Sequence, residues 1–175
     1  MQLLPHADEP HAHVVSFDLE ASRRADGALA LCYRLNSDLS HWRVPKTTEP
    51  RRADGLWQHT CFEVFIAIPG SNAYCELNFS PSGEWAAYAF TGYRAGMALL
   101  ELSAPPAARW VQSQGLLELS VVLEPLALPR AAGPLRLGAS AVLEAQSGTI
   151  SHWALAHPAG PPDFHHPESF VWQLP

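Results

Sequence analysis

Two acidic side chains occur in neighbouring segments that alternate between apolar and polar residues. Glu63 belongs to the stretch 57–66, and Glu76 and Asn78 belong to 74–79. Because successive strand side chains point to opposite faces, both acids and the amide fall on the face opposite the main apolar rows. Opposed side chains on adjacent strands can lie within about 5 Å of each other. Such a pair can bind the hydroxyl groups of a sugar, hold a cation, or act as an acid and a base.

Aromatic and polar side chains near these acids complete a candidate ligand-binding set. Trp57, Trp85 and Tyr93 could stack on a sugar ring, because a flat aromatic face packs against axial C–H groups. Ala86 leaves room on the third strand, and Arg94 is a further hydrogen-bonding candidate. The candidate ligand-binding residues are Trp57, His59, Glu63, Glu76, Asn78, Trp85, Tyr93, Arg94, His157, His165 and His166.

These features also have a purely structural interpretation. Exposed strand positions are usually polar, so the two acids could be solvated on an open sheet face. Most aromatic residues in a chain of this size fill the core. The distinguishing observation is whether the acids, His59 and the histidines of the C-terminal tail converge on one cavity.

Catalysis is an alternative use of the same residues. Glu63 or Glu76 could act with His59 as acid and base on a sugar-like metabolite, because burial and a neighbouring like charge raise the pKa of a carboxyl group. The sequence contains no nucleophile elbow, phosphate-binding loop or dinucleotide fingerprint. A serine-based hydrolase is therefore not indicated, and we assign no catalytic residue.

Haem binding is a second alternative, although no cofactor is assigned. Met97 lies in a glycine-containing loop, and a methionine with a histidine can ligate haem iron. The histidines and cysteines do not have the spacing of a zinc site, so no transition-metal site is predicted.

The composition indicates a globular domain and argues against nucleic acid as a partner. The chain has 175 residues, 47% hydrophobic and 16% charged, with a net charge of −6. A single domain spanning 1–175 is expected at this length. Nucleic-acid phosphates are bound by clustered Lys and Arg, and the sequence has no such cluster.

The sequence also gives expectations about location and redox state. Segment 1–9 has neither a positive leader nor the apolar run of a secretory signal, and no later window reaches membrane-spanning length. We therefore expect a cytoplasmic protein with no membrane partner. Cys61 and Cys75 fall on opposite faces of their strands, so no disulfide is expected between them. The oligomeric state is left open.

Alternating segments separated by turns predict an all-β fold. In segment 12–20 the residues Val15, Phe17 and Leu19 are expected to face the core, and 37–55 is expected to be a long loop. No window carries a sustained helical stripe, the best candidate being the short 98–102. The predicted architecture is an antiparallel β-sandwich of the jelly-roll or Greek-key type with immunoglobulin-like layers. Its strands are expected at 12–20, 29–36, 57–66, 74–79, 84–90, 117–123, 135–141 and around 150–155.

Several runs together resemble bacterial DOMON-like domain proteins, which look related to family-nine carbohydrate-binding modules. The two most specific runs are GLWQHTCFEVFI from position 55 and YCELNFSPSGEWAAY from position 74. The others are GYR from position 92, WALAHP from 153 and PDFHHP from 162, so the resemblance spans nearly the whole chain.

The resemblance implies a fold and a ligand class rather than a reaction. It implies a sandwich of two antiparallel sheets that binds a small molecule, most simply a saccharide, or haem. The run holding Trp57 and Glu63 looks like the strand that opens the common core of the sugar-binding modules, and Glu76 with Asn78 looks like its partner. The structural calcium of those modules is left open as a further cofactor, since the sequence lacks a clear acidic cluster for it.

Overall fold

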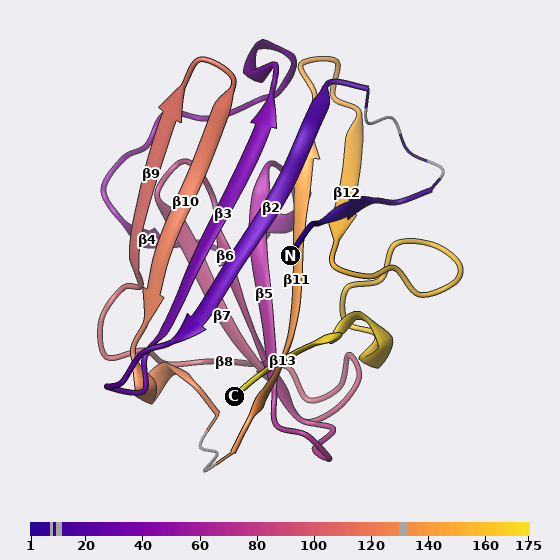
Figure 1. Cartoon of the computed structure of the whole chain (residues 1–175). Coiled ribbons are helices and arrows are strands. Elements are labelled where there is room, and N and C mark those ends of the chain that lie inside the picture. The colour runs from indigo at the N-terminus through magenta and orange to yellow at the C-terminus, as the bar shows by residue number, and fades with distance from the viewer. Residues whose placement is uncertain (8, 10–11, 130–132) are drawn as a thin grey trace.

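The computed structural model describes residues 1–7, 9, 12–129 and 133–175 and is built almost entirely from strands (Figure 1). The strands are β1 Leu4–Pro5, β2 Val14–Arg23, β3 Leu29–Ser37, β4 Arg51–Arg52, β5 Cys61–Ala67, β6 Tyr74–Phe79, β7 Glu84–Phe90, β8 Ala98–Leu99, β9 Ala107–Ser113, β10 Leu116–Leu123, β11 Leu135–Glu144, β12 Ile150–Ala154 and β13 Trp172–Leu174. Short 3-10 turns lie at Leu39–His41, Leu56–Gln58, Pro125–Ala127 and Pro167–Ser169. Within the described residues, no helix is long and apolar enough to cross a membrane.

The strands form two sheets that face each other as layers (Figure 1). The larger sheet has the order β1-β12-β11-β5-β6-β7-β4, with β13 paired to β11 and β8 paired to β7. The smaller sheet has the order β2-β3-β10-β9. Most neighbours pair antiparallel, and β4 pairs with β7 in parallel. The predicted antiparallel β-sandwich is therefore confirmed.

The main core lies between the sheets and contains the apolar rows that alternation predicts. On β3, Leu29, Leu31, Tyr33 and Leu35 are all buried, and each is separated from the next by a more exposed residue. The Tyr33 hydroxyl is satisfied inside this core by donating to the backbone oxygen of Glu63 at 2.7 Å. This bond joins the smaller sheet to the strand that carries the first candidate acid.

The central hairpin forms with the predicted faces. In the β5–β6 register Glu63 lies opposite Asn78 and Phe65 lies opposite Glu76. Phe62, Val64 and Ile66 face the inter-sheet core with Cys75, Leu77 and Phe79, whereas Cys61, Phe65 and Tyr74 belong to a second buried cluster on the other face. Cys61 and Cys75 therefore lie on opposite faces, as predicted, and both are free thiols.

The outer face of the larger sheet is not open to solvent. The 3-10 turn Leu56–Gln58 and the C-terminal tail cover it, and they bring Leu56, Phe164 and Phe170 against the second cluster. Phe170 packs on Phe65 with ring centroids 5.9 Å apart. The sheet consequently has a buried layer on each side, and the interpretation of the acids as solvated side chains is wrong.

Two predicted strands differ from the observed ones, the first in which residues face the core and the second in the residue at which the strand begins. Val15 is 84% exposed, because the β2–β3 register shifts between Val14 and Ser16 and leaves Val15 as the extra residue of a β-bulge. The predicted strand 57–66 begins only at Cys61, because Gly55 adopts φ 75° and starts the 3-10 turn before it.

Three further segments were assigned differently or not at all from the sequence. The best helix candidate, 98–102, forms no helix, and its first two residues, Ala98–Leu99, are the short strand β8. The long loop 37–55 contains a 3-10 turn and β4. The edge strand β9 was not predicted, because its mostly exposed side chains do not alternate in burial.

Candidate functional site

A cavity of about 510 Å³ lies on the outer face of the larger sheet, beneath the loop that follows β7 and the C-terminal tail. We call it the sheet cavity. Strands β5, β6, β7, β11 and β12 each contribute a side chain from their outer face, and the loops contribute the rest. Its lining residues are Trp57, Glu63, Glu76, Tyr88, Phe90, Arg94, Met97, Val142, His152, Pro162, Phe164 and His165.

The two acids lie at the inner end of the sheet cavity. Glu63 is 2% exposed and Glu76 is 5% exposed, whereas Trp57 and Met97 are largely exposed at the outer end. Glu63 Oε2 accepts a hydrogen bond from Ser140 Oγ at 3.0 Å, and Glu76 Oε1 accepts from Asn78 Nδ2 at 2.8 Å. Glu63 Oε1 is buried without a hydrogen-bond partner. The inner end therefore holds a carboxyl oxygen that no described protein group satisfies.

Burial raises the pKa of both acids. Removal from water, reinforced by the charge of Glu76, raises the pKa of Glu63 to about 8, with the Ser140 hydrogen bond acting in the opposite direction. Burial also raises the pKa of Glu76, but the Asn78 amide and the nearby charge of Arg94 oppose this. Glu63 therefore carries a proton at neutral pH.

The His165 imidazole is neutral and is held beside the acids. Burial, assisted by the charge of Arg94, lowers its pKa to about 4. The Tyr74 hydroxyl accepts from the backbone N–H of Arg94 at 3.3 Å and forms a hydrogen bond of 2.7 Å with His165 Nδ1. His165 Nε2 lies 3.7 Å from Glu76 Oε2. The tail thus places an imidazole next to the second acid.

Arg94 connects the loop after β7 to the tail. Its guanidinium pairs with Asp163 at 2.8 Å, and the Tyr93 hydroxyl donates to the same carboxylate. The backbone of Arg94 has φ 50°, a left-handed conformation that costs a residue with a side chain about 1–2 kcal/mol. The contacts with Asp163 and Tyr74 offset this strain and hold the wall of the sheet cavity in place.

The structure brings together six of the sequence-predicted candidates. Trp57, Glu63, Glu76, Arg94 and His165 line the sheet cavity. Asn78 lies beside them, fully buried and bonded to Glu76.

Five other candidates lie elsewhere. Trp85 is on the opposite face of β7, where it packs on the inter-sheet core beneath the Arg52 guanidinium, 5.5 Å from the ring centroid. His157 contacts the backbone oxygen of Leu4. Tyr93 and His166 stack edge to face outside the cavity, at a centroid distance of 6.0 Å. His59 lines a different cavity.

Several lining residues were missed by the sequence analysis. Tyr88 and Phe90 share the face of Ala86, so alternation along 84–90 could have identified them. Val142 and His152 are directly paired across β11 and β12, which no local pattern reveals. Pro162 and Phe164 belong to the tail, whose position over the sheet has no local signal.

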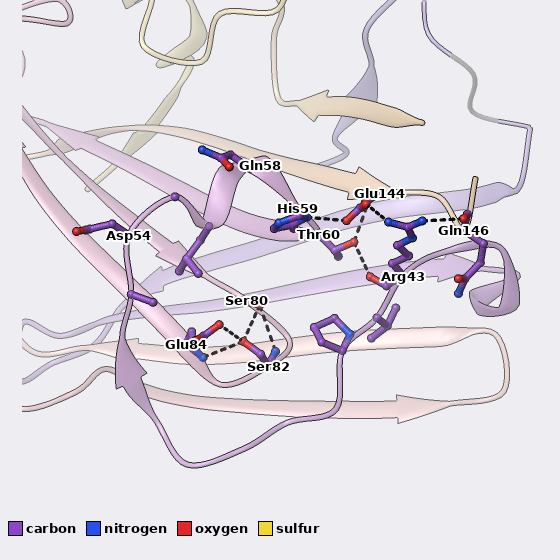
Figure 2. Close-up of a pocket in the computed structure, with 15 residues that line it drawn as sticks. Arg43, Asp54, Gln58, His59, Thr60, Ser80, Ser82, Glu84, Glu144 and Gln146 are labelled. Carbon is purple, nitrogen blue, oxygen red and sulfur yellow. Dashed lines mark hydrogen bonds and ion pairs between the residues drawn. The ribbon is translucent and has the colours of Figure 1, made fainter. Parts of the chain in front are cut away.

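A second cavity, of about 680 Å³, lies at the end of the larger sheet and is lined mainly by polar side chains (Figure 2). Glu144 accepts from Arg43 Nη1 through Oε1, and its Oε2 lies 2.8 Å from His59 Nδ1. Opposite them, the Ser82 hydroxyl donates to the Glu84 carboxylate at 2.9 Å. We call this the polar end cavity, and many of its polar groups bind one another.

The position of His59 bears directly on the acid–base alternative. His59 follows the 3-10 turn Leu56–Gln58 and points into the polar end cavity toward Glu144 (Figure 2). Glu63 and Glu76 line the sheet cavity instead. The acid–base pair of His59 with Glu63 or Glu76 is therefore not brought together in one cavity. Within the described part of the chain, no three His, Cys, Asp or Glu side chains gather as a metal-binding group.

Comparison with known proteins identifies similar folds. No family model matches the chain, and no curated protein matches it significantly. A crystal structure of a putative carbohydrate-binding protein from Bacteroides uniformis superposes with a TM-score of 0.61 at 13% identity, covering 98% of this chain and 84% of that one. A family-nine carbohydrate-binding module from Caldicellulosiruptor kristjanssonii, in complex with glucose, gives a TM-score of 0.56 at 9% identity, with 95% and 78% covered. At these identities the likeness establishes the sandwich fold.

Proposed function

We propose that this protein is a non-catalytic module that binds a small saccharide in the sheet cavity. The observation that carries the proposal is the arrangement of an exposed indole above a buried acid pair. Trp57 stands 44% exposed at the outer end, and Glu63 and Glu76 lie beneath it with hydrogen-bonding capacity directed at the cavity. A sugar needs both surfaces, because its ring has apolar C–H faces and a polar rim of hydroxyl groups.

The chemistry of the sheet cavity matches a polar ring of modest size. Its volume of about 510 Å³ falls within the range typical of small-molecule sites. Trp57 and Tyr88 lie edge to face with centroids 6.2 Å apart, so the outer wall is already a packed aromatic surface. At the inner end Glu63 Oε1 lacks a hydrogen-bond partner, and a ligand hydroxyl, which can donate or accept, would supply one.

The fold comparisons support the same ligand class. One similar structure is described as a putative carbohydrate-binding protein, and the other is a carbohydrate-binding module holding glucose. The resemblance of runs 55–66 and 74–88 to bacterial DOMON-like domain proteins favours the same assignment. We also propose that the chain is a distant relative of the family-nine carbohydrate-binding modules and of the DOMON-like domain proteins.

Removal of the Trp57 ring should weaken saccharide binding. We expect glucose to change the tryptophan fluorescence of the wild type, and Trp57→Ala to lower its affinity by about tenfold or more, because stacking on an aromatic face is lost. Trp57→Phe should retain part of the affinity. Leu99→Ala removes another exposed apolar side chain outside the cavity and serves as the control. Titrations with glucose, xylose and galactose that give neither fluorescence change nor heat would contradict the proposal.

Haem is a second candidate ligand for the same cavity, favoured by the position of Met97. Met97 and His152 both line the cavity, and thioether and imidazole are an axial pair that haem iron accepts. His152 Nδ1 is held 2.7 Å from Glu9 Oε1, so Nε2 is the nitrogen left for a metal. Bound haem would supply redox or gas-binding chemistry.

Haem binding has a direct spectroscopic test. If Met97 is a ligand, the protein mixed with haem and passed through a desalting column should keep a Soret band, and Met97→Leu should shift it. A protein that leaves the column colourless rules this candidate out.

A further inference from the structure

We infer that the sheet cavity selects ligands that carry a positive charge, and that its preferred saccharide is one bearing a protonated amine. This inference rests on the proposed function, because it names the chemical class of the same ligand. It is carried by the buried, unpartnered oxygen of Glu63 and by the lack of an unpaired cation beside the two acids among the described lining residues.

The acid pair has acceptors in excess of donors once Glu63 gives up its proton. Glu63 Oε1, at the inner end of the cavity, and Asn78 Oδ1, in the layer beside it, are both buried without a hydrogen-bond partner, and the two residues face each other across β5 and β6. The amide oxygen is an acceptor, and the Glu63 oxygen becomes one when the carboxyl group ionises. An ammonium group brings three N–H donors and no acceptor, whereas a hydroxyl brings one donor and lone pairs that need donors of their own. The donor deficit therefore favours an ammonium over a hydroxyl.

The positive side chains around the cavity are already neutralised or uncharged. The Arg94 guanidinium is paired with Asp163, and the His152 ring is held against Glu9. His165 stays neutral because its burial lowers its pKa to about 4. The positive charge that acts on Glu76 is that of Arg94, which Asp163 already pairs, so a carboxylate formed in this acid pair favours a further cation from solution.

The walls above the acids are also suited to a cation. Trp57, Tyr88, Phe90 and Phe164 line the cavity, and the electron-rich face of an aromatic ring attracts an ammonium or an N-methylated cation. An aromatic enclosure over a buried carboxylate combines dispersion, charge pairing and cation–π attraction on one ligand group. A neutral sugar would use only the first of these.

A bound cation should also change the protonation of Glu63. An ammonium beside the acids stabilises both carboxylates, so the O–H bond of the Glu63 carboxyl breaks and its proton leaves to solvent. The groups near the acid pair that bear on this titration are Tyr33, Cys61, Tyr74, Glu76, Asn78, Tyr88, Arg94, Ser140, Asp163 and His165. None of these brings an unpaired positive charge to Glu63, so the ligand is the group that releases the proton.

Three sugars that share the glucose ring but differ in the substituent at C2 separate the effect of ligand charge from that of ligand shape. Calorimetric titrations near pH 6 would compare D-glucosamine, which is protonated there, with D-glucose and with the neutral amide N-acetyl-D-glucosamine. We expect glucosamine to bind about tenfold more tightly than the other two, the factor equivalent to one pKa unit of differential interaction. Glu76→Gln, which removes the charge and keeps the shape, should reduce this preference to below about threefold. Glu84→Gln removes an acid of the polar end cavity and should leave the preference unchanged.

Tetramethylammonium tests the charge without a sugar and cannot itself lose a proton. Its binding, followed with a pH indicator in weakly buffered solution, should release about one proton per protein near neutral pH, and Glu63→Gln should abolish this release. Thermal melting of each variant checks that it is folded.

The possible outcomes separate the charge preference from the saccharide proposal. Equal affinities for glucose and glucosamine would overturn the preference for charge and leave the proposed saccharide function standing. Binding of tetramethylammonium with proton release, but of no sugar, would support the cation site and refute the saccharide. If none of the four compounds binds, both proposals are wrong.

Discussion

Replacing Glu63 with glutamine is expected to stabilise the protein at alkaline pH by roughly 3–5 kcal/mol relative to the wild type, while the two proteins differ little in their pH response below about pH 4.5. Glu63 is fully enclosed, and its pKa is raised to about 8 by burial and by the charge of Glu76. A glutamine has the same shape, keeps an acceptor for Ser140 and never ionises.

The sign of this effect follows from proton uptake. The folded pKa lies above the unfolded one, so the folded state holds an extra proton between about pH 4.5 and pH 8. Its contribution to stability is fully present below the unfolded pKa and is lost as the pH rises through the folded pKa. Wild-type stability should therefore fall across this range by about 1.4 kcal/mol per pH unit from this group, and the variant should not show that fall.

Chemical unfolding of both proteins at a series of pH values measures the effect. Other groups, including His165 with its lowered pKa, titrate in both proteins and largely cancel in the difference. Glu118→Gln is a suitable control, because Glu118 is a partly exposed acid on the smaller sheet paired with Arg34. A difference between wild type and Glu63→Gln that stays constant with pH would mean that Glu63 ionises normally in the folded protein.

The sequence was sufficient to place the two acids on one face of a sheet. Alternation fixes the face of each residue on 61–67 and 74–79, and the short turn between them fixes the pairing, so Glu63 meets Asn78 as expected. Whether that face is buried depends on the tail. Phe164 and Phe170 reach it from a segment about a hundred residues later, and the periodicity of a strand contains no information about such a contact.

Alternation also failed wherever the strand was not continuous. Counting by twos from Glu63 puts His59 on the same face, but the 3-10 turn at Leu56–Gln58 breaks the count and sends His59 to the polar end cavity. The bulge at Val15 is the same kind of error, with one extra residue turned outward. Trp85 was a candidate for its residue type alone, although its position on β7 places it on the face of Ala87, where it is partly buried against the inter-sheet core.

The C-terminal tail turns one face of the larger sheet into a cavity, and its attachment can be located. Phe170 is buried against Phe65 and Tyr74, with ring centroids 5.9 and 5.5 Å apart. Its backbone oxygen accepts from Arg136 Nη2 at 2.9 Å. Beside it, a Cβ built on Gly138 would lie 3.2 Å from the backbone oxygen of Ser169, so the tail rests directly on β11. Phe170 is thus the main apolar anchor of the tail.

Phe170→Ala should therefore affect stability and ligand binding together. Truncation of a buried phenylalanine typically costs about 3–5 kcal/mol, so we expect a loss near the lower end of that range in chemical unfolding. Because His165 and Phe164 precede this anchor and line the sheet cavity, saccharide affinity should fall by about tenfold or more, and the amides of 163–170 should exchange faster with deuterium. Val171→Ala alters the adjacent, exposed side chain and should change stability by less than about 0.5 kcal/mol. If Phe170→Ala lowers stability and speeds exchange in the tail but binds glucose as well as the wild type, the tail covers the sheet without forming part of the binding site, and the ligand is held by the strands and Trp57 alone.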